Sequence, residues 1–325
     1  MLVLLLLGLT TCWHERGDLG LVHLRAARVM FWKCRAGMVG SSPTGGEDEA
    51  GVASERFFAQ ALVYWEMVMS FASSEPVPVG ELFVGEWHEL DGAAPLTPPG
   101  EKRSIRPHPW AGVAPGVQML FAEVGKLFRY RRQTSGLVLH PQMPEHVLDS
   151  ARSLKKALLR ISLPTADEIL PSGDTTISPE NFVLIAEATR STGLLMLHRV
   201  FPTLRRRQSA DDDSDPCPIL ATKIVHGLCS IRASEGAQFI QLLELNCAAA
   251  ELRLSQTATV EVQKQTLHAR DAALGRFDEL SRRLPAKPIR QIMQLLVEVW
   301  RLGDAGRDVF WMDVMATNGW QTFMG

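Results

Sequence analysis

The sequence predicts a globular protein with an all-α fold, and three observations point to it. Nearly every apolar run in the 325 residues has helical spacing, with apolar side chains three or four positions apart. No segment shows a sustained alternation of apolar and polar residues flanked by hairpin turns, the pattern of a half-buried strand. Hydrophobic residues make up 46% of the chain and charged residues 22%, as in globular proteins with a large core. We therefore expect one domain of stacked antiparallel helices over residues 1–325, without substantial sheet.

The chain begins with the aliphatic stretch MLVLLLLGL. A secretory signal would carry a positive charge before the apolar run and small residues after it, but the first positive residue is Arg16 and bulky Trp13 follows the run. The run is also shorter than the ~20 residues that cross a bilayer. We predict a wholly buried helix, followed by a Gly/Asp turn and a second, amphipathic helix in GDLGLVHLRAARVMFWK. A buried helix beginning at Met1 without a preceding cap also predicts that part of the protein lies upstream.

Four longer amphipathic helices are predicted further along the chain. Ser54 is the expected N-cap of the first of these helices, and Ser178 followed by Pro179 is a typical helix start. The apolar stripes lie in SERFFAQALVYWEMVMSF, PGVQMLFAEVGKLFRYRR, SPENFVLIAEATRSTGLLMLHRVF and IRQIMQLLVEVWRLGD.

Three stretches are predicted to be mobile loops, at 36–51, 75–109 and 205–218. The first is rich in Gly, Ser and acidic residues, and the second is rich in proline. The second also contains the only weak strand candidates, around FVGEWHELDG and just before Pro107, and a short helix is expected around Trp87.

Composition excludes some classes of function. The net charge of −2 makes the chain a poor binder of nucleic acid by itself, because no positive surplus would hold a phosphate backbone. The five cysteines are scattered, with no C-x-x-C pair and no histidine at zinc-finger spacing. They are predicted to be buried or free thiols in a reducing compartment, so we expect no metal site in this chain.

One acidic cluster fits a metal-binding pattern. Asp211, Asp212 and Asp215 match D-D-x-x-D, which in helical diphosphate-processing enzymes holds Mg²⁺ against pyrophosphate oxygens. Such a motif lies on a helix that faces an apolar cavity. Here the cluster follows three arginines at 205–207 and precedes Pro216, so a solvated loop is the favoured interpretation and the enzyme is the alternative.

No other motif indicates catalysis. The nine histidines form no H-x-x-x-H pair, and no G-x-S-x-G elbow, phosphate loop or dinucleotide fingerprint occurs. The prediction is that the chain is not an enzyme and has no catalytic residues. The basic clusters at 129–132 and 205–207 follow amphipathic helices, where cations favour the helix dipole. The alternative for both clusters is a nuclear import signal or a phosphate contact. The tryptophans are predicted to anchor the core, with ligand lining as the alternative: Trp65, Trp110, Trp300, Trp311 and Trp320.

Five stretches in order resemble one known family. They are HLRAARVM, RFFAQALVYWEMVMSFAS, HPWAGVAPGVQMLFAEVGKLFRYRR, AEATRSTGLLMLHRVFP, and LLVEVWRLGDAGRDVFWMDVMATNGWQTFMG at the end. Together they resemble the C-terminal regulatory region of fungal zinc-cluster transcription factors, the fungal-specific transcription factor domain of the second type. The likeness covers about residues 2–325. The resemblance implies that MLVLLLLGL is core helix and that the fold is all-α.

The resemblance also implies a function. Such a domain regulates transcription by RNA polymerase II in the nucleus, through other transcription proteins, self-association or a small-molecule effector. The family binds DNA through an N-terminal six-cysteine zinc cluster, which this chain lacks. Either the true N-terminus is missing from this sequence, or the protein is a relative without the cluster that acts through partners. Zinc is therefore expected only in a missing N-terminal cluster, DNA contact is expected only indirectly or through that cluster, and no membrane contact is expected. The alternatives are the diphosphate enzyme above and a helical scaffold unrelated to transcription.

Overall fold

The structure is a computed structural model that describes residues 1–15, 17–39, 49–75, 104–135, 144–171, 177–205, 217–232, 238–254 and 259–322. These residues contain eleven α-helices and no strand longer than a single bridge, which confirms the all-α prediction. The helices are α1 (Leu2–His14), α2 (Leu21–Val39), α3 (Glu49–Ala72), α5 (Pro115–Ser135), α6 (Glu145–Arg160), α7 (Pro179–Val200), α8 (Cys217–Ser230), α9 (Leu242–Ala250), α10 (Val260–Ser281), α11 (Ala286–Asp304) and α12 (Trp311–Thr317).

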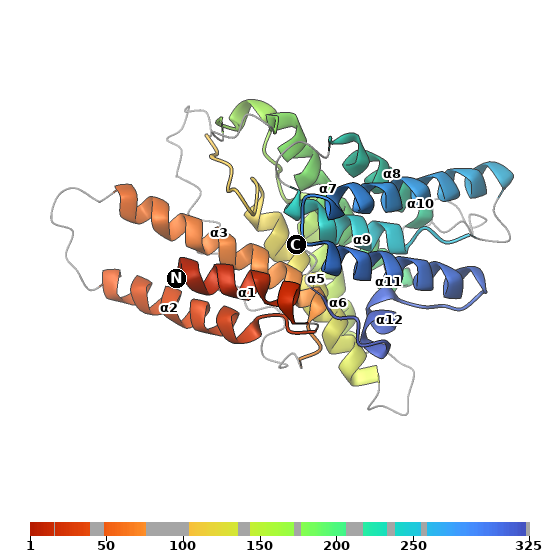
Figure 1. Cartoon of the computed structure of the whole chain (residues 1–325), viewed down its shortest axis with the longest axis horizontal. Helices are drawn as coiled ribbons and strands as arrows, with labels where there is room; N and C mark the ends of the chain where they lie inside the picture. Colours follow the sequence, from red (N-terminus) through yellow and green to blue (C-terminus); the bar gives the residue numbers. More distant parts are fainter. Residues whose placement is uncertain are drawn as a thin grey trace.

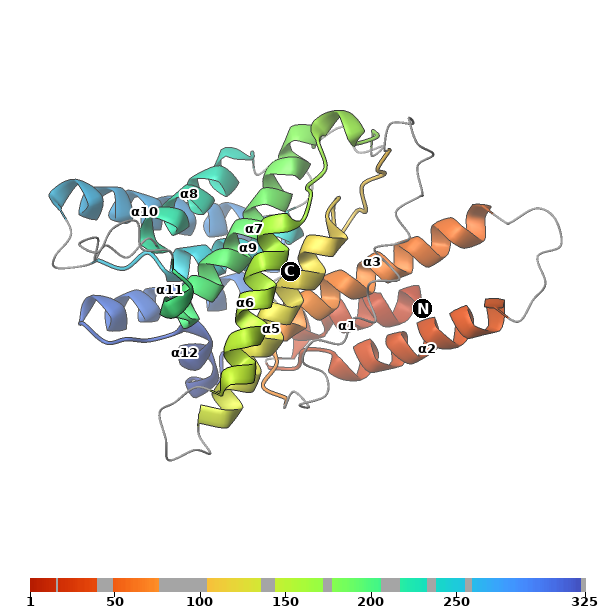
Figure 2. The same ribbon diagram turned by 180° about the vertical axis from the view of Figure 1, so that it is seen from behind.

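The helices lie in three groups along the long axis of the molecule (Figure 1). The N-terminal helices α1, α2 and α3 form one end, and α8, α10 and α11 form the other. Between them α5, α6 and α7 cross the middle, as the view from behind shows (Figure 2). Each group packs against the next through long amphipathic faces, so the hydrophobic core is continuous from end to end.

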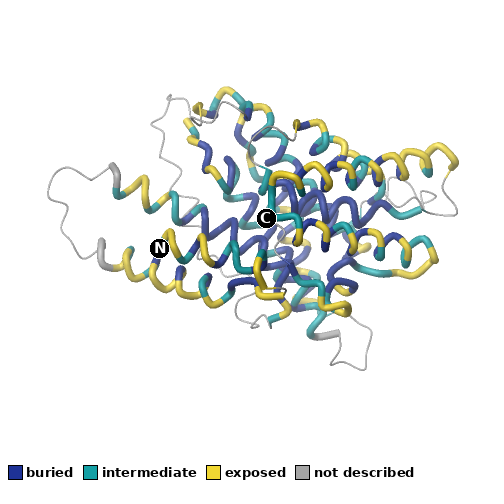
Figure 3. Tube along the Cα trace, viewed as in Figure 1, coloured by how far each residue is buried: buried dark blue, intermediate teal, exposed yellow. Residues whose placement is uncertain are grey.

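Helix α9 lies at the centre of the second half. All nine of its residues are buried, including the polar Glu244 and Asn246. Helices α7, α8, α10 and α11 surround it, and the buried residues gather in this region of the molecule (Figure 3). The core role predicted for the tryptophans is confirmed for Trp65 and Trp311, which are fully buried, and for Trp300, which is nearly so. Trp110 and Trp320 are only partly buried, packed against the core.

Helix α1 packs as a helix against α2 and α3, so the aliphatic N-terminal stretch belongs to the fold. Gly8 provides the point of closest approach. A Cβ built there would lie 1.9 Å from Cη2 of Trp65, and a Cβ built on Gly20, whose φ is +67°, would lie 2.3 Å from the Gly8 carbonyl oxygen. Only a residue without a side chain fits this contact.

The prediction that α1 is wholly buried is wrong. Leu5, Gly8 and Cys12 face the core, whereas another face of the helix is open to solvent. That face carries four large apolar residues: Leu2, Val3, Leu6 and Leu7. A run of nearly continuous aliphatic residues hides the 3.6-residue period by which a buried face is recognised, so the sequence pattern gave no indication of it.

The predicted helix starts had mixed outcomes. Ser178 is the N-cap of α7 and accepts a hydrogen bond from the Asn181 backbone N–H, with Pro179 at the first position. Ser54 is not an N-cap, because α3 begins at Glu49 and Ser54 lies inside it. Together with α2, which continues to Val39, α3 also makes both ends of the predicted 36–51 loop helical.

The other two predicted loops lie largely outside the described residues. In the second, the strand candidate just before Pro107 makes only an isolated parallel bridge, from Ile105 to Ile169. Its other features, around FVGEWHELDG and Trp87, lie outside the described part. The third stretch, 205–218, ends in helix, since α8 begins at Cys217.

Candidate functional site

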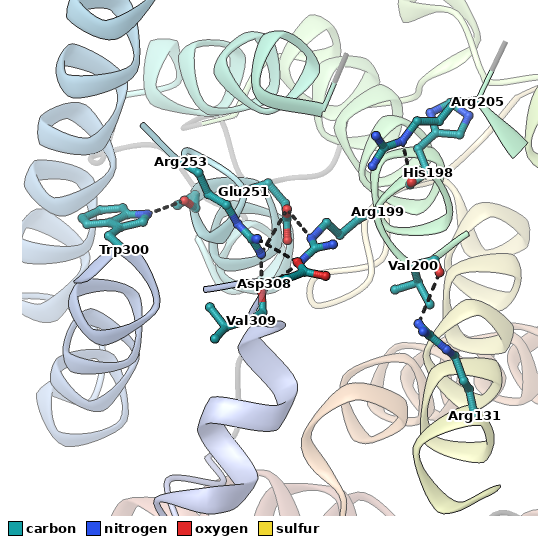
Figure 4. Close-up of polar contacts among 11 residues, drawn as sticks. Arg131, His198, Arg199, Val200, Arg205, Glu251, Arg253, Trp300, Asp308 and Val309 are labelled. Carbon is teal, nitrogen blue, oxygen red and sulfur yellow. Dashed lines mark hydrogen bonds and ion pairs between the residues drawn. The ribbon is translucent and has the colours of Figure 1, made fainter. Parts of the chain in front are cut away.

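Four charged side chains meet where α7, α9 and the connection between α11 and α12 come together (Figure 4). Arg199 lies in the last turn of α7, Glu251 directly follows α9, Arg253 lies two residues later, and Asp308 belongs to the connection. Arg199 Nε lies 3.0 Å from Glu251 Oε2, and its Nη2 contacts the Asp308 carboxylate. Arg253 contacts the same two carboxylates at 3.7 Å and 3.3 Å. We call these four residues the arginine–carboxylate cluster.

Burial makes the cluster stronger than a surface ion pair. The Glu251 side chain is 2% exposed and that of Arg199 is 14% exposed, whereas Asp308 is 82% exposed. Burial works to lower the pKa of Arg199, but the Glu251 and Asp308 carboxylates outweigh it and raise that pKa. Burial likewise works to raise the pKa of Asp308, and the two arginines hold it below its usual range. Arg199 and Asp308 are therefore both ionised near neutral pH.

Two further arginines donate hydrogen bonds to backbone carbonyls at the end of α7. Such carbonyls have no partner within the helix and need one from elsewhere. Arg131 on α5 donates to the Val200 carbonyl at 3.2 Å, and Arg205 Nε donates to that of His198 at 2.9 Å. Both carbonyls lie at the C-terminal end of α7, so this end is held in place by guanidinium groups (Figure 4).

A second network holds the segment after α9 from the opposite side. Arg270 on α10 makes two 2.7 Å contacts with the Asp304 carboxylate and donates to the Leu252 carbonyl at 2.7 Å. Trp300 Nε1 donates to the Ala249 carbonyl at 2.8 Å, and the Arg270 guanidinium lies over the Trp300 ring. The backbone that presents Glu251 and Arg253 is thus fixed on both sides.

A hollow of about 500 Å³ opens beside the cluster, and we call it the arginine pocket. Three of its walls are α5, the end of α7 and the segment from the α11–α12 connection into α12. Its charged lining residues are Arg131, Arg132, Arg199, Asp308 and Asp313. Its apolar lining residues are Phe128, Val200, Pro202 and Phe310. A volume in this range, with an apolar wall and a few converging polar groups, is typical of small-molecule sites.

Arg131 is a partly desolvated cation of this pocket. Burial lowers its pKa, Asp313 and Asp308 work in the opposite direction, and Arg199 lowers it further by repulsion. The neighbouring Arg132 pairs with Asp313 on α12, with Nε 2.5 Å from Oδ1. The pocket therefore has guanidinium groups from two helices close enough to repel each other.

The sequence singled out these residues only in part. The cluster 129–132 was interpreted as a basic helix end, and α5 does end shortly after it, at Ser135. The pocket that contains Arg131 and Arg132 was missed, because all of its other lining residues except Phe128 lie more than 60 positions away in the sequence. One signal for the cluster was present in the sequence, because Glu251 directly follows an apolar helix and lies two residues before Arg253. A charge next to a buried helix needs a partner of opposite charge.

The acidic cluster of Asp211, Asp212 and Asp215 lies outside the described residues, as do Arg206 and Arg207. Within the described part of the chain, no group of three or more His, Cys, Asp or Glu side chains is placed to hold a metal ion. The five cysteines are free and lie apart on α1, α2, α8 and α9. These cysteines do not fit a zinc cluster, which needs several thiolates around each ion.

Among the described residues, every helix is too short or too polar to span a bilayer.

Comparison with known proteins gives one match. No curated protein and no solved structure matches the chain. The family described as the fungal specific transcription factor domain matches residues 1–325, which is the whole chain. The predicted resemblance is confirmed, and the chain belongs to the fungal specific transcription factor domain family.

Proposed function

We propose that this chain is a non-enzymatic regulatory domain that acts in the nucleus on transcription by RNA polymerase II, and that an effector in the arginine pocket sets its output. Family membership supports a role in transcription regulation. The arginine pocket supports the binding of an effector, because it is a formed hollow lined by several charged groups.

The position of the pocket supports a regulatory role. Its walls come from α5 in the middle group and from the segment at the C-terminal end of the chain, from Asp308 to Asp313. A ligand that contacts both walls would hold that segment against α5 and α7. Binding energy used in this way shifts the balance between two arrangements of the segment, which is how a ligand changes the output of a regulatory domain.

Protein contacts are the second part of the proposal. The exposed face of α1 carries Leu2, Val3, Leu6 and Leu7, which are 44–66% exposed. Apolar residues gathered on one exposed face are a common feature of protein contact sites. This face supports association with other transcription proteins or with a second copy of the chain. DNA would then be reached through a partner or through a zinc cluster outside this chain.

The test is a reporter assay in a fungal host. The chain is fused to an unrelated DNA-binding domain, and output is measured from a promoter that carries the matching sites. The expected result is a change in reporter output relative to the DNA-binding domain alone, altered again by Arg131→Gln. Output identical to that of the DNA-binding domain alone would contradict the proposed function.

A further inference from the structure

The arginine pocket differs in charge between its inner wall and its rim. Its lining has three guanidinium groups and two carboxylates. The cations lie deep, with the side chains of Arg199 and Arg132 14% and 30% exposed. The carboxylates of Asp308 and Asp313 lie at the rim, 82% and 54% exposed. Water weakens the field of an exposed charge far more than that of a buried one, so the cations prevail over the carboxylates among the lining residues. The buried Glu251, which is not a lining residue, pairs with Arg199.

The positive groups are also held in place before any ligand arrives. Arg199 is fixed by Glu251 at 3.0 Å and by the carbonyl of Val309 at 3.0 Å. Arg131 is fixed by the carbonyl of Val200 and lies over the ring of Phe201. Side chains that are already ordered lose little entropy when a ligand binds, which favours affinity.

Arg131 and Arg199 repel each other across the α5–α7 boundary, and each is partly removed from water. An anion placed between them would offset both the repulsion and the lost hydration. A cation in the same place would add to the repulsion. The pocket lining also includes four apolar residues, Phe128, Val200, Pro202 and Phe310. These would disfavour a fully hydrated inorganic ion and favour a ligand with an apolar body.

We infer that the arginine pocket binds a small organic carboxylate, with its carboxylate toward Arg131 and Arg199 and its apolar body against Phe128 and Phe310. This inference rests on the proposed function only in naming the ligand class of the same pocket. The inference also gives the two rim residues a role, because Asp313 and Asp308 pair with pocket arginines and would compete with the ligand carboxylate for them.

The direct test uses a pair of probes of similar size and opposite charge. Binding of 4-fluorobenzoate and of 4-fluorobenzylammonium to the whole chain is followed by the ¹⁹F NMR linewidth of each probe. A probe of this size should bind with a dissociation constant of the order of 1 mM. We expect saturable broadening of the benzoate and none of the benzylammonium. Equal broadening of both, or broadening of neither, would overturn the inference.

Two substitutions place the binding at this pocket. Arg131→Gln should weaken benzoate binding at least about tenfold, whereas Arg152→Gln, which removes an exposed arginine of α6 paired with Asp149, should leave it unchanged. Asp313→Asn removes a competing carboxylate and should tighten binding about twofold to threefold. A destabilised protein would not show this gain, so the inference stays testable if Arg131→Gln fails to fold. Equal effects of Arg131→Gln and Arg152→Gln, or weaker binding by Asp313→Asn, would contradict it.

The reporter assay separates this inference from the proposed function. Reporter regulation without benzoate binding would refute the ligand class and leave the regulatory domain standing. Benzoate binding at the pocket without reporter regulation would support the site and refute the function.

Discussion

Replacing Gly8 by alanine tests whether α1 is docked in the fold as the structure shows. Gly8 lies inside α1, and the added Cβ would meet Trp65 at 1.9 Å and 2.3 Å from two ring carbons. Trp65 is completely buried, so its ring has no free space into which it can move. Gly275 provides the matched control, because it lies inside α10 and its added Cβ would have no neighbour within 4 Å.

The two substitutions are chemically identical and differ only in packing. In a helix interior, alanine is favoured over glycine by roughly 0.5–1 kcal/mol, so Gly275→Ala should stabilise the protein by that amount. At Gly8 the same gain is opposed by overpacking, which costs about 3 kcal/mol at the upper end of its usual range. The expected net effect of Gly8→Ala is a loss of about 2 kcal/mol, which leaves a difference of about 3 kcal/mol between the variants.

The assay is urea unfolding, followed by far-ultraviolet circular dichroism and by tryptophan fluorescence. The transition midpoint should rise for Gly275→Ala and fall for Gly8→Ala, with similar slopes for both variants. If both variants are stabilised equally, α1 does not pack on Trp65, and the assignment of the N-terminal stretch to the core is refuted.

Three further predictions can be checked by the same unfolding measurements. Glu251→Gln should cost about 2–3 kcal/mol, because it leaves two largely buried arginines with a single carboxylate, that of the exposed Asp308. Asp149→Asn, in an exposed pair, should cost under about 1 kcal/mol, and equal costs would contradict the role of burial. Burial raises the pKa of Glu244 to about 7, so the folded chain keeps a proton that the unfolded chain loses. Stability should therefore fall by roughly 3 kcal/mol as pH rises from the ordinary glutamate range to about 7, and Glu244→Gln should remove this slope; an unchanged pH profile would show that the carboxyl is not buried. Leu5→Ala, at a completely buried position of α1, should cost about 2–5 kcal/mol. Leu7→Ala, where the side chain is 50% exposed, should cost under about 1 kcal/mol, and similar costs would place both faces of α1 in the core.

Much of the helical framework could be predicted from local pattern. The start of α7 follows from Ser178 and Pro179, because capping depends on residues that are adjacent in sequence. The start of α3 was placed too late, at Ser54. A residue suited to N-capping does not mark the start of a helix when the residues before it are themselves helical.

The exposed face of α1 could not be predicted from the local sequence pattern. Leu5 and Leu7 are two residues apart in an unbroken aliphatic run, yet one is completely buried and the other is half exposed. Helix periodicity predicts that they point in different directions, but not which direction faces α2 and α3. That orientation is set by the contact of Gly8 with Trp65 and Gly20, which involves residues from three separate segments.

The fold class, the family and most of the helices follow from the sequence alone, because these depend on the spacing and order of apolar residues along the chain. The tertiary structure alone decided which charged residues meet. Arg131, Arg199, Glu251 and Asp308 come from four distant segments, and nothing in the local pattern of any one of them indicates the others. They come together because the ends of α7 and α9 and the connection before α12 converge, and the charges and carbonyls buried there need partners.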